Sequence, residues 1–231
     1  MTPHSFLPEF DVAPYRLSGV VYGTLLNHEP ALTALGETVH AAPYKAPPVA
    51  PVMYVKPRNT LTGNGAFITV PTDHAELEIG ASLGIVIGRT ACRLTPEEAL
   101  DHVAGYTVVG DISLPHDIFY RPSIRLKARD GFCPVASSVV PRSAIANPDA
   151  LTVRVYVDGM LAQDTNTAER RRSVARLLAD VTDFMTLSPG DVLMLGVSAG
   201  APRVRAGQQV RIEIEGVGHL ENQFISEGAA Q

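Results

Sequence analysis

The chain has 231 residues, of which 45% are hydrophobic and 19% are charged, so it can build a sizeable core and is not a disordered chain. Its formal net charge is −5 and no basic patch stands out, which argues against a nucleic-acid partner. Its apolar stretches are too short and too interrupted to span a membrane. The N-terminus lacks the basic start and apolar run of an export signal, and only two cysteines, Cys92 and Cys133, are present. We therefore expect a reduced cytoplasmic protein without a disulfide scaffold.

The first 50 residues are irregular. A short strand is expected around Leu17–Leu26 and a small helix at Glu29–His40. The proline-rich stretch APYKAPPVAP, residues 42–51, is typical of an extended connection and is the only candidate domain boundary. The sequence therefore predicts an N-terminal cap and lid segment at residues 1–45 and a main domain at residues 46–231.

Strands dominate the middle of the chain. They are expected at Val52–Val55, at AFITVP (66–71) and at residues 75–88. Thr95-Pro96-Glu97-Glu98 then combines a cap, a proline at the first helical position and a capping box, which predicts a short helix before Gly105. A further strand, GYTVVGDIS, follows it.

The C-terminal half contains a hairpin, a helix and two strands. Asp158-Gly159 between two alternating segments predicts a tight hairpin. Asn166 or Thr167 is expected to cap a helix with an apolar stripe that runs to Met185, and the arginines at 170–172 are expected on its solvated face. Strands are expected at 192–197 and 209–216. Many strands and two or three helices predict a β-rich α+β fold with one closed or rolled sheet.

The strand at residues 75–88, AELEIGASLGIVIG, carries two glutamates on one face. Glu76 and Glu78 lie two residues apart, so their side chains point the same way. The other face is continuously apolar and must be buried: Ala75, Leu77, Ile79, Ala81, Leu83, Ile85 and Ile87. The glutamate face continues with small residues that leave space, Gly80, Ser82 and Gly84. Two like charges beside an open cavity require a compensating cation or a shared proton, and a metal ion is the first candidate.

A second Glu-x-Glu pair serves as an internal comparison. Glu213 and Glu215 share their face with Arg211, as in an ordinary half-exposed strand. The first pair has no Lys or Arg nearby on its strand before Arg89, which favours a site over the alternative of a salt-bridged structural pair.

Asp111 adds a third acid, at the end of an apolar strand and before the turn SLPHD. Its alternative role is to cap that turn. Two glutamates and an aspartate form an all-oxygen donor set, which suits Mg²⁺, Mn²⁺ or Ca²⁺ rather than zinc. The seven histidines form no His-x-x-His pair, so a zinc site is not expected.

Several motifs occur in the order found in one known family. YKxPxxxxxxxVKPxNTLxGxG, ExExGxxLGIVIG, GYTxxxD, KxxDGFCP, QDxNT and MTLxPGDVL together make the chain resemble the fumarylacetoacetate hydrolase superfamily, from about Tyr44 to the last strand. The resemblance implies a mixed β-roll or barrel with a short N-terminal cap, and a homodimer or related oligomer. It also implies metal binding by Glu76, Glu78 and Asp111 and an active-site lysine at Lys127.

The sequence departs from the family pattern at two places. Ser113–Asp117 stands where many members carry an Arg in a SARD-like stretch, and Leu195–Gly200 replaces a TGTPxG motif with its threonine contact. Substrate contacts of the hydrolase members therefore do not carry over. Tyr120, Arg121 and Arg125 are the candidates for binding substrate carboxylates in their place.

YRPSIRLKARDGFCP and LGVSAGAP are most similar to the isomerase/decarboxylase members of 4-hydroxyphenylacetate degradation, particularly to their first-half type of subunit. The resemblance implies decarboxylation of 5-oxopent-3-ene-1,2,5-tricarboxylate and isomerisation of 2-hydroxyhepta-2,4-diene-1,7-dioate. A divalent metal, Mg²⁺ first, would stabilise the dienolate common to both reactions, with no organic cofactor. His28 and Glu29 on the lid are the first candidates for the proton carrier, and His116 is the second.

Two other functions stay open. One is a hydrolase of acylpyruvates, or a 2-oxo acid decarboxylase, of the same superfamily. The other is a non-catalytic subunit that completes a second isomerase/decarboxylase subunit, although retention of all three acids argues against it. In each enzymatic case the ligand is a small 2-oxo di- or tricarboxylate.

Overall fold

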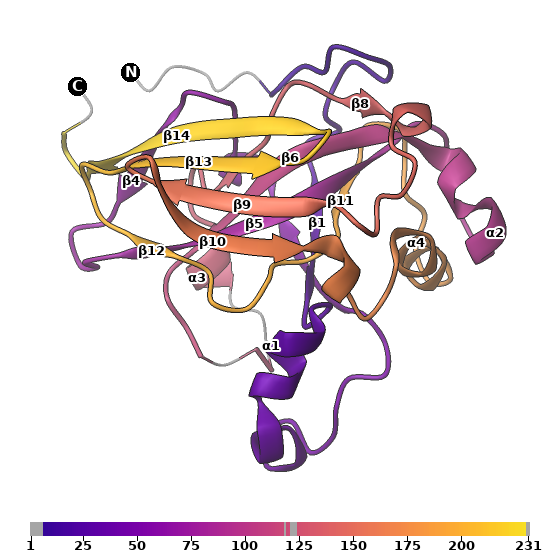
Figure 1. The fold of residues 1–231 in the computed structure, drawn as a ribbon, viewed down its shortest axis with the longest axis horizontal. Coiled ribbons are helices and arrows are strands. Elements are labelled where there is room, and N and C mark those ends of the chain that lie inside the picture. The colour runs from indigo at the N-terminus through magenta and orange to yellow at the C-terminus, as the bar shows by residue number, and fades with distance from the viewer. Residues whose placement is uncertain (1–6, 118, 121–123, 230–231) are drawn as a thin grey trace.

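The computed structural model describes residues 7–117, 119–120 and 124–229. Its strands form mixed sheets of seven, five and two strands, which confirms the predicted β-rich α+β fold (Figure 1). The seven-stranded sheet has the order β2-β1-β11-β5-β6-β8, with β12 also paired to β5, and the five-stranded sheet has the order β10-β9-β13-β14-β4. In the described part of the chain the sheets stay separate, so there is no closed barrel.

The large sheet contains β1 (Val21–Leu25), β2 (Val52–Lys56), β5 (Leu77–Ile87), β6 (Val103–Ser113), β8 (Val140–Pro141), β11 (Val192–Met194) and β12 (Arg203–Val204). The five-stranded sheet contains β4 (Phe67–Val70), β9 (Thr152–Val157), β10 (Met160–Asn166), β13 (Gln209–Ile214) and β14 (Gly218–Ser226), and the small sheet β3 (Leu61–Thr62) and β7 (Cys133–Pro134). The helices are α1 (Glu29–Ala34), α2 (Pro96–Ala99), α3 (Ile124–Lys127) and α4 (Val174–Thr182). The 3₁₀ turns are η1 (Gly36–His40), η2 (Arg58–Thr60), η3 (Leu100–His102), η4 (Arg142–Ala144) and η5 (Thr167–Glu169).

The antiparallel pair β5 and β6 lies at the centre of the molecule. The alternate side chains of β5 from Leu77 to Ile87 are buried as predicted, and they pack with apolar residues of the five-stranded sheet such as Val155 and Ile212. The opposite face of the large sheet is covered as well, by a second cluster that includes Val21 and Val109. Because both faces are covered, these strands are apolar almost throughout.

The predictions from local sequence are confirmed where the interacting residues are close together in the chain. The Thr95–Glu98 capping box is present, with the Thr95 amide donating to Glu98 Oε1 at 2.9 Å. Asp158 and Gly159 both have positive φ, 51° and 79°, as the tight turn between β9 and β10 requires.

The predicted start of the long helix is wrong. Asn166 caps only the 3₁₀ turn η5, by accepting from the Ala168 amide at 2.8 Å, and α4 begins after Ser173. The residues between them leave the helical path because Arg170 forms a β-bridge with His28, a tertiary contact that local sequence does not reveal. Phe184, predicted on the apolar stripe, lies beyond the helix and is exposed.

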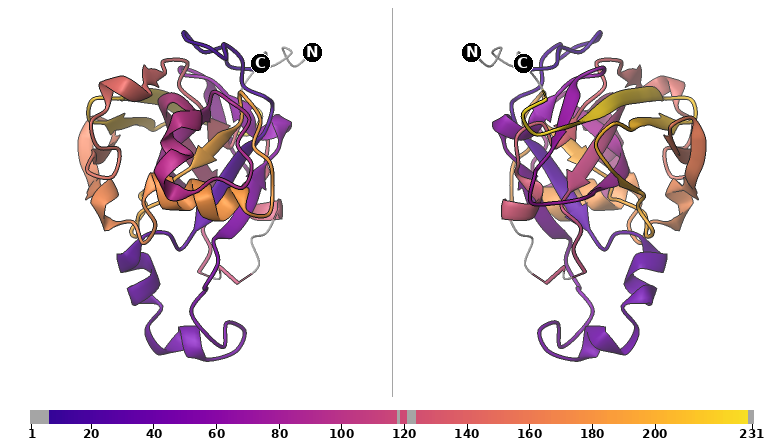
Figure 2. Two further views of the ribbon diagram at one scale, coloured as in Figure 1. Left: turned by 90° about the vertical axis from the view of Figure 1, so that its right-hand side faces the viewer. Right: turned by 90° about the vertical axis from the view of Figure 1, so that its left-hand side faces the viewer.

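The N-terminal segment contributes both a strand and a projecting arm. β1 lies inside the large sheet between β2 and β11, although it falls within the range 1–45 expected to form a cap. α1 and η1 extend away from the body of the molecule (Figure 2). The division at residue 45 stays a prediction. None of the helices in the described residues has the length and hydropathy to cross a membrane.

Gly80 allows the central strands to approach one another and the chain after β11. A Cβ at this position would lie 2.6 Å from Val197 Cγ2 and 2.8 Å from the Asp111 carbonyl oxygen, which cannot move without the sheet. We predict that Gly80→Ala lowers the free energy of unfolding by about 1–3 kcal/mol. Gly63→Ala, where a Cβ meets nothing within 4 Å, is the control and should not destabilise. Equal melting temperatures for the two variants would contradict this account of the strand packing.

Candidate active site

A cavity of about 560 Å³ opens at the ends of β5 and β6. Its floor contains Glu78 and Gly80 from β5, Asp111 and Ser113 from β6, and Lys127 from α3. In the antiparallel register Gly80 is opposite Asp111 and Glu78 is opposite Ser113, so these side chains share one face. The other walls come from α1 and from the chain after β11, including Ala31, Ala34, Leu35 and residues 197–201.

Asp111 is a buried carboxylate between two lysines. Its Oδ1 lies 2.8 Å from Lys56 Nζ and its Oδ2 lies 3.1 Å from Lys127 Nζ, while the Tyr54 hydroxyl also donates to Oδ2. Burial by itself would raise the pKa of Asp111. The ammonium groups of Lys127 and Lys56, helped by the hydrogen bond from Tyr54, outweigh it and hold this pKa well below its ordinary value. Asp111 is therefore an anion at any physiological pH.

Lys56 is fully buried and uses all its donors on the backbone. Its Nζ donates to the carbonyls of Ile112, Lys127 and Phe132 at 2.7, 2.8 and 3.0 Å. An ammonium has three protons, so its attraction for Asp111 is that of a nearby charge rather than an aligned hydrogen bond. This explains why Asp111 Oδ1 has a cation beside it and yet no well-aligned hydrogen-bond donor among the described residues.

Tyr54 completes this buried cluster. Burial, followed by the Asp111 charge, raises its pKa well above the ordinary value, so it remains a hydroxyl donor. Its ring also contacts Lys127, whose Nζ lies 4.9 Å from the ring centroid. A Cβ at Gly23 of β1 would lie 2.1 Å from Tyr54 Cζ, so the ring reaches Asp111 only because glycine stands there. The sequence did not single out Tyr54 or Lys56, because the residue pattern of one strand does not show which distant groups its side chains contact.

The predicted metal carboxylates are divided between two environments. Glu78 lines the cavity and is half-buried; burial raises its pKa, while Lys127 and Arg203 oppose the shift. Glu76 does not line the cavity, because its Oε1 accepts from the Arg205 guanidinium at 2.8 and 2.9 Å. Among the described residues, no three His, Cys, Asp or Glu side chains lie close enough to hold a metal ion. The role of Glu76 as a ligand stays a prediction.

Glu76 has a compensating arginine that its own strand does not carry, so the prediction that the whole first pair is free of salt bridges is wrong. Arg205 follows β12, which pairs with β5 although the two are far apart in the sequence. The comparison pair behaves as predicted: Glu213 contacts Arg211 at 3.2 Å, and Glu215 accepts from the Thr152 hydroxyl at 2.7 Å.

His28 is buried next to the cavity rather than in its lining. Its Nδ1 accepts from the Ala199 amide at 3.0 Å, and its Nε2 lies 3.0 Å from Glu169 Oε2. Because a backbone amide only donates, the proton of the neutral ring is on Nε2 and is given to Glu169. Glu29, its predicted companion, is exposed and lies outside the cavity lining. The partner of His28 is thus Glu169, which sequence analysis missed.

His116, the second candidate for the proton carrier, lines the cavity. Its Nδ1 lies 2.9 Å from the Leu114 carbonyl, which can only accept, so Nδ1 carries the proton. Its Nε2 has no hydrogen-bond partner among the described residues. Burial is the largest cause that lowers the pKa of His116, so its ordinary state is the neutral imidazole.

Of the predicted carboxylate binders, Tyr120 and Arg125 do not line the cavity. Tyr120 is exposed and stacks edge-to-face on Tyr44, with 5.8 Å between ring centroids. Arg125 is exposed on α3 and is not part of the lining. Arg121 lies outside the described residues. Arg203 on β12 does line the cavity, and sequence analysis missed it.

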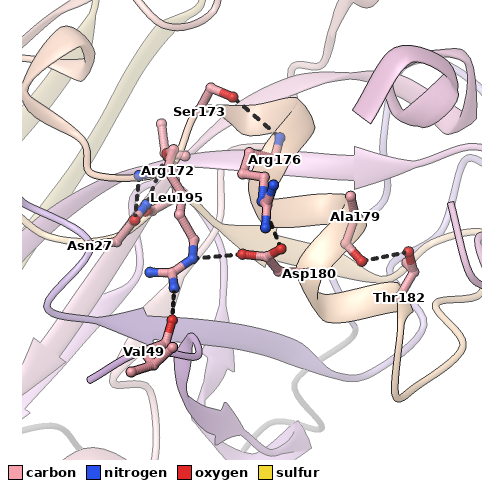
Figure 3. A network of polar contacts seen from close by, with 9 residues as sticks. All are labelled: Asn27, Val49, Arg172, Ser173, Arg176, Ala179, Asp180, Thr182 and Leu195. Atoms are coloured by element: carbon pink, nitrogen blue, oxygen red, sulfur yellow. Dashed lines mark hydrogen bonds and ion pairs between the residues drawn. The ribbon is translucent and has the colours of Figure 1, made fainter. Parts of the chain in front are cut away.

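The arginine run at 170–172 is not the solvated helix face that was predicted. The Asn27 side chain donates to the Leu195 carbonyl at 2.8 Å and accepts from the Arg172 amide at 2.9 Å (Figure 3). Arg172 then pairs with Asp180 at 2.7 Å, and Arg170 donates to Ser198 Oγ at 3.1 Å. These contacts hold the base of α1 against the chain after β11.

Comparison with known proteins agrees with this geometry. Residues 20–225 match the family model described as fumarylacetoacetate (FAA) hydrolase, C-terminal. The chain belongs to the fumarylacetoacetate hydrolase family. It is 39% identical over 211 residues to the 4-hydroxyphenylacetate degradation bifunctional isomerase/decarboxylase of Escherichia coli. That match covers 91% of this chain and 48% of the relative, so the chain spans about half the length of that protein.

Solved structures share the fumarylacetoacetate hydrolase fold. A 2-hydroxyhepta-2,4-diene-1,7-dioate isomerase from Mycobacterium marinum superposes with a TM-score of 0.75 and 27% identity, covering 92% of this chain and 76% of that one. A fumarylpyruvate hydrolase from Pseudomonas aeruginosa, solved in complex with Mn²⁺ and pyruvate, superposes with a TM-score of 0.76 over 92% of this chain and 91% of that one. At 23% sequence identity, this superposition shows a shared fold and no more.

The two lysines around Asp111 should have separable roles. Lys56→Met leaves three carbonyls and a buried carboxylate without their cation, and we expect it to cost about 3–5 kcal/mol of stability. Lys127→Met removes the ion pair with Asp111 and the contact with the Tyr54 ring but leaves Lys56 beside Asp111, so it should reduce turnover with a smaller change in melting temperature. Thermal unfolding and steady-state kinetics of both variants test this division. A Lys56→Met protein as stable as the wild type would contradict it.

Acidification should loosen the contact between His28 and Ala199. Burial, the largest cause, and the Arg170 charge lower the pKa of His28, while Glu169 opposes them. Unfolding restores a pKa near 6.5, so the unfolded chain binds more protons as the pH falls below that value. The stabilisation is thus fully present above about pH 6.5 and is lost as the pH falls through the folded pKa.

The unfolding free energy of wild type and of His28→Gln, compared between about pH 7.5 and 5.5, measures this effect. We expect the wild type to lose more stability and the protection factor of its Ala199 amide, corrected for the intrinsic pH dependence of exchange, to be lower at the acid end. His219→Gln, at an exposed histidine on β14, is the matched control. Parallel profiles for all three proteins would remove His28 as the titrating group.

Proposed function

We propose that this protein is a divalent-metal-dependent enzyme that decarboxylates 5-oxopent-3-ene-1,2,5-tricarboxylate and isomerises 2-hydroxyhepta-2,4-diene-1,7-dioate. The observation that carries the proposal is the convergence of Glu78, Asp111 and Lys127 in one cavity of a fumarylacetoacetate hydrolase fold. The similarity to the E. coli isomerase/decarboxylase and to the M. marinum isomerase supports the choice of substrates.

The residues of the cavity fit a hard divalent ion. Among the described residues no aligned donor occupies Asp111 Oδ1, Glu78 supplies a second carboxylate, and both residues line the cavity. Glu76 would become a third ligand by leaving Arg205. Carboxylate oxygens favour Mg²⁺, Mn²⁺ or Ca²⁺, with Mg²⁺ first. When bound, the ion supplies Lewis acidity toward the 2-oxo acid end of the substrate.

The charges around the cavity favour an anionic substrate bound together with such an ion. Of the described groups that line it, Glu78, Asp111 and Asp117 are anionic and Lys127 and Arg203 are cationic; Lys56, which is outside the lining, pairs with Asp111, so these six charges sum to zero. The dianionic dienedioate alone would leave a net charge of −2, which a divalent ion cancels. The tricarboxylate with the same ion would leave −1 until CO₂ is lost.

We assign to Lys127 the stabilisation of the negative charge that develops on the substrate. Its ammonium is buried and held by Asp111 and by the Tyr54 ring, so it needs little reorganisation when charge forms near it. Loss of CO₂ or of a proton leaves electrons delocalised toward the 2-oxo oxygen. A fixed cation at the cavity edge stabilises that charge or holds a carboxylate of the substrate.

His116 is the better candidate for the proton carrier. Isomerisation moves one proton from the 2-hydroxyl group to a carbon, which requires one group that first accepts and then donates it. His116 lines the cavity and its Nε2 atom has no partner among the described residues, whereas both ring nitrogens of His28 already have partners. α1, which forms one wall through Ala31 and Ala34, would exclude water as a lid. We also propose that the protein acts in the cytoplasm, as a homodimer or in a complex with a second isomerase/decarboxylase subunit.

The assay uses the purified chain with Mg²⁺ or Mn²⁺ and each of the two substrates, followed by CO₂ release and by loss of the conjugated chromophore. We expect activity that chelation with EDTA abolishes. Acetylpyruvate serves as the comparison substrate, because faster turnover of it would favour an acylpyruvate hydrolase. Absence of all these activities in the metal-loaded protein would reject the proposal.

The two glutamate pairs should differ in metal binding. Glu78→Gln keeps the shape but removes a charge from the cavity, and we expect activity to fall at least about 100-fold while the fold is retained. Glu76→Gln should also weaken Mn²⁺ binding, measured by electron paramagnetic resonance, if Glu76 leaves Arg205 for the metal. Glu213→Gln and Glu215→Gln are the matched controls and should be nearly silent. Equal damage from both pairs would remove the distinction between them.

A further inference from the structure

Two Arg–Glu pairs lie one after the other across β5 and β12. Arg203 is directly opposite Glu78 in the antiparallel register, and Arg205, two residues further, reaches Glu76. Residues two apart on a strand share a face, so the two pairs have the same orientation. They therefore offer an internal comparison of what each arginine does.

The outer pair, Arg205 and Glu76, is joined by hydrogen bonds, whereas the inner pair, Arg203 and Glu78, is not. Both Nε and Nη2 of Arg205 donate to Glu76 Oε1, at 2.9 and 2.8 Å. Arg203, by contrast, has neither a hydrogen bond nor an ion pair within 4.0 Å among the described residues, although its charge acts on Glu78 from further away. Glu78 is turned into the cavity, and Arg203 lines that same cavity. The inner arginine is thus a cation at the site without a carboxylate of its own.

The position of Arg203 separates it from the other cations of the site. Glu78 is opposite Arg203 on β12 and opposite Ser113 on β6, so Glu78 lies between the two neighbouring strands. Adjacent strands are about 4.8 Å apart, which puts β12 about 10 Å from β6. Asp111 and Lys127 gather on the β6 side. The cavity therefore has cationic groups at two ends, with Glu78 between them.

We propose that Arg203 binds the second carboxylate of the substrate and makes the enzyme selective for 2-oxo acids that carry an anionic far end. This inference rests on the proposed function, because the 2-oxo acid end must be held near Glu78 and Asp111. A guanidinium suits the far end, because it is always charged and its planar donors match a carboxylate. Arg203 is in contact with solvent at the rim, so it can release water for a ligand without disturbing the core.

The test compares two ligands of equal length in the presence of Mg²⁺. 2-Oxoadipate has a carboxylate at its far end, and 2-oxohexanoate has a methyl group there. Binding of each to wild type, Arg203→Met, Arg203→Lys and Arg176→Met is measured by isothermal titration calorimetry. Arg176 is an exposed arginine of α4 outside the cavity lining, so its variant controls for the loss of one surface charge.

We expect wild type to prefer 2-oxoadipate, and Arg203→Met to bind it about 10- to 100-fold more weakly. Affinity for 2-oxohexanoate should stay within about twofold, Arg203→Lys should keep part of the preference, and Arg176→Met all of it. An unchanged preference in Arg203→Met, or none in wild type, would overturn this inference and leave the proposed function standing. Failure of wild type to bind either 2-oxo acid or oxalate would reject both.

Discussion

The site depends on one buried anion. Asp111 sits at the end of β6 with the ammonium groups of Lys56 and Lys127 on either side, and burial would protonate it if they were absent. Lys56 in turn is buried because three backbone carbonyls accept its protons. The same lysine therefore fixes the carboxylate and joins β2 to the chain around α3. Stability and the electrostatics of the cavity are set by the same few contacts, since a buried charge is tolerated only with its partners in place.

Two glycines allow the central strands and the Tyr54 ring to lie close to Asp111. Gly80 brings β5 close to Asp111, and Gly23 makes room for the Tyr54 ring that donates to it. Glycine is needed here for close approach rather than for an unusual backbone angle. The start of β5 lines the cavity through Glu78 and Gly80, while the opposite face of the strand is filled by the core. The predicted open space beside Ser82 and Gly84 is absent, because these residues are outside the lining and a Cβ at Gly84 would lie 2.6 Å from Val109. β5 thus contributes side chains of one face to the core and Glu78, on the other face, to the site.

Sequence and structure agree where the interaction is local or periodic. The capping box at Thr95, the turn at Asp158-Gly159 and the buried alternate residues of β5 are encoded within a few positions, so the sequence was sufficient for them. The start of α4 was misplaced because Arg170 pairs with His28 across 142 positions. For the same reason His28 was linked with its neighbour Glu29, when the fold gives it Glu169.

Alternation along the strands was enough to predict the β-rich fold, and the order of the motifs was enough to show the family resemblance. That resemblance, rather than any strand pattern, assigned Lys127 to the same site as Glu78 and Asp111. The pairing of the charges came from the three-dimensional fold: Arg205 pairs with Glu76, Lys56 pairs with Asp111, and Arg203 has no partner among the described residues of the cavity. The physical reason is that a side chain's partner is set by the register between strands distant in the sequence, and a strand's own pattern carries no record of its neighbour.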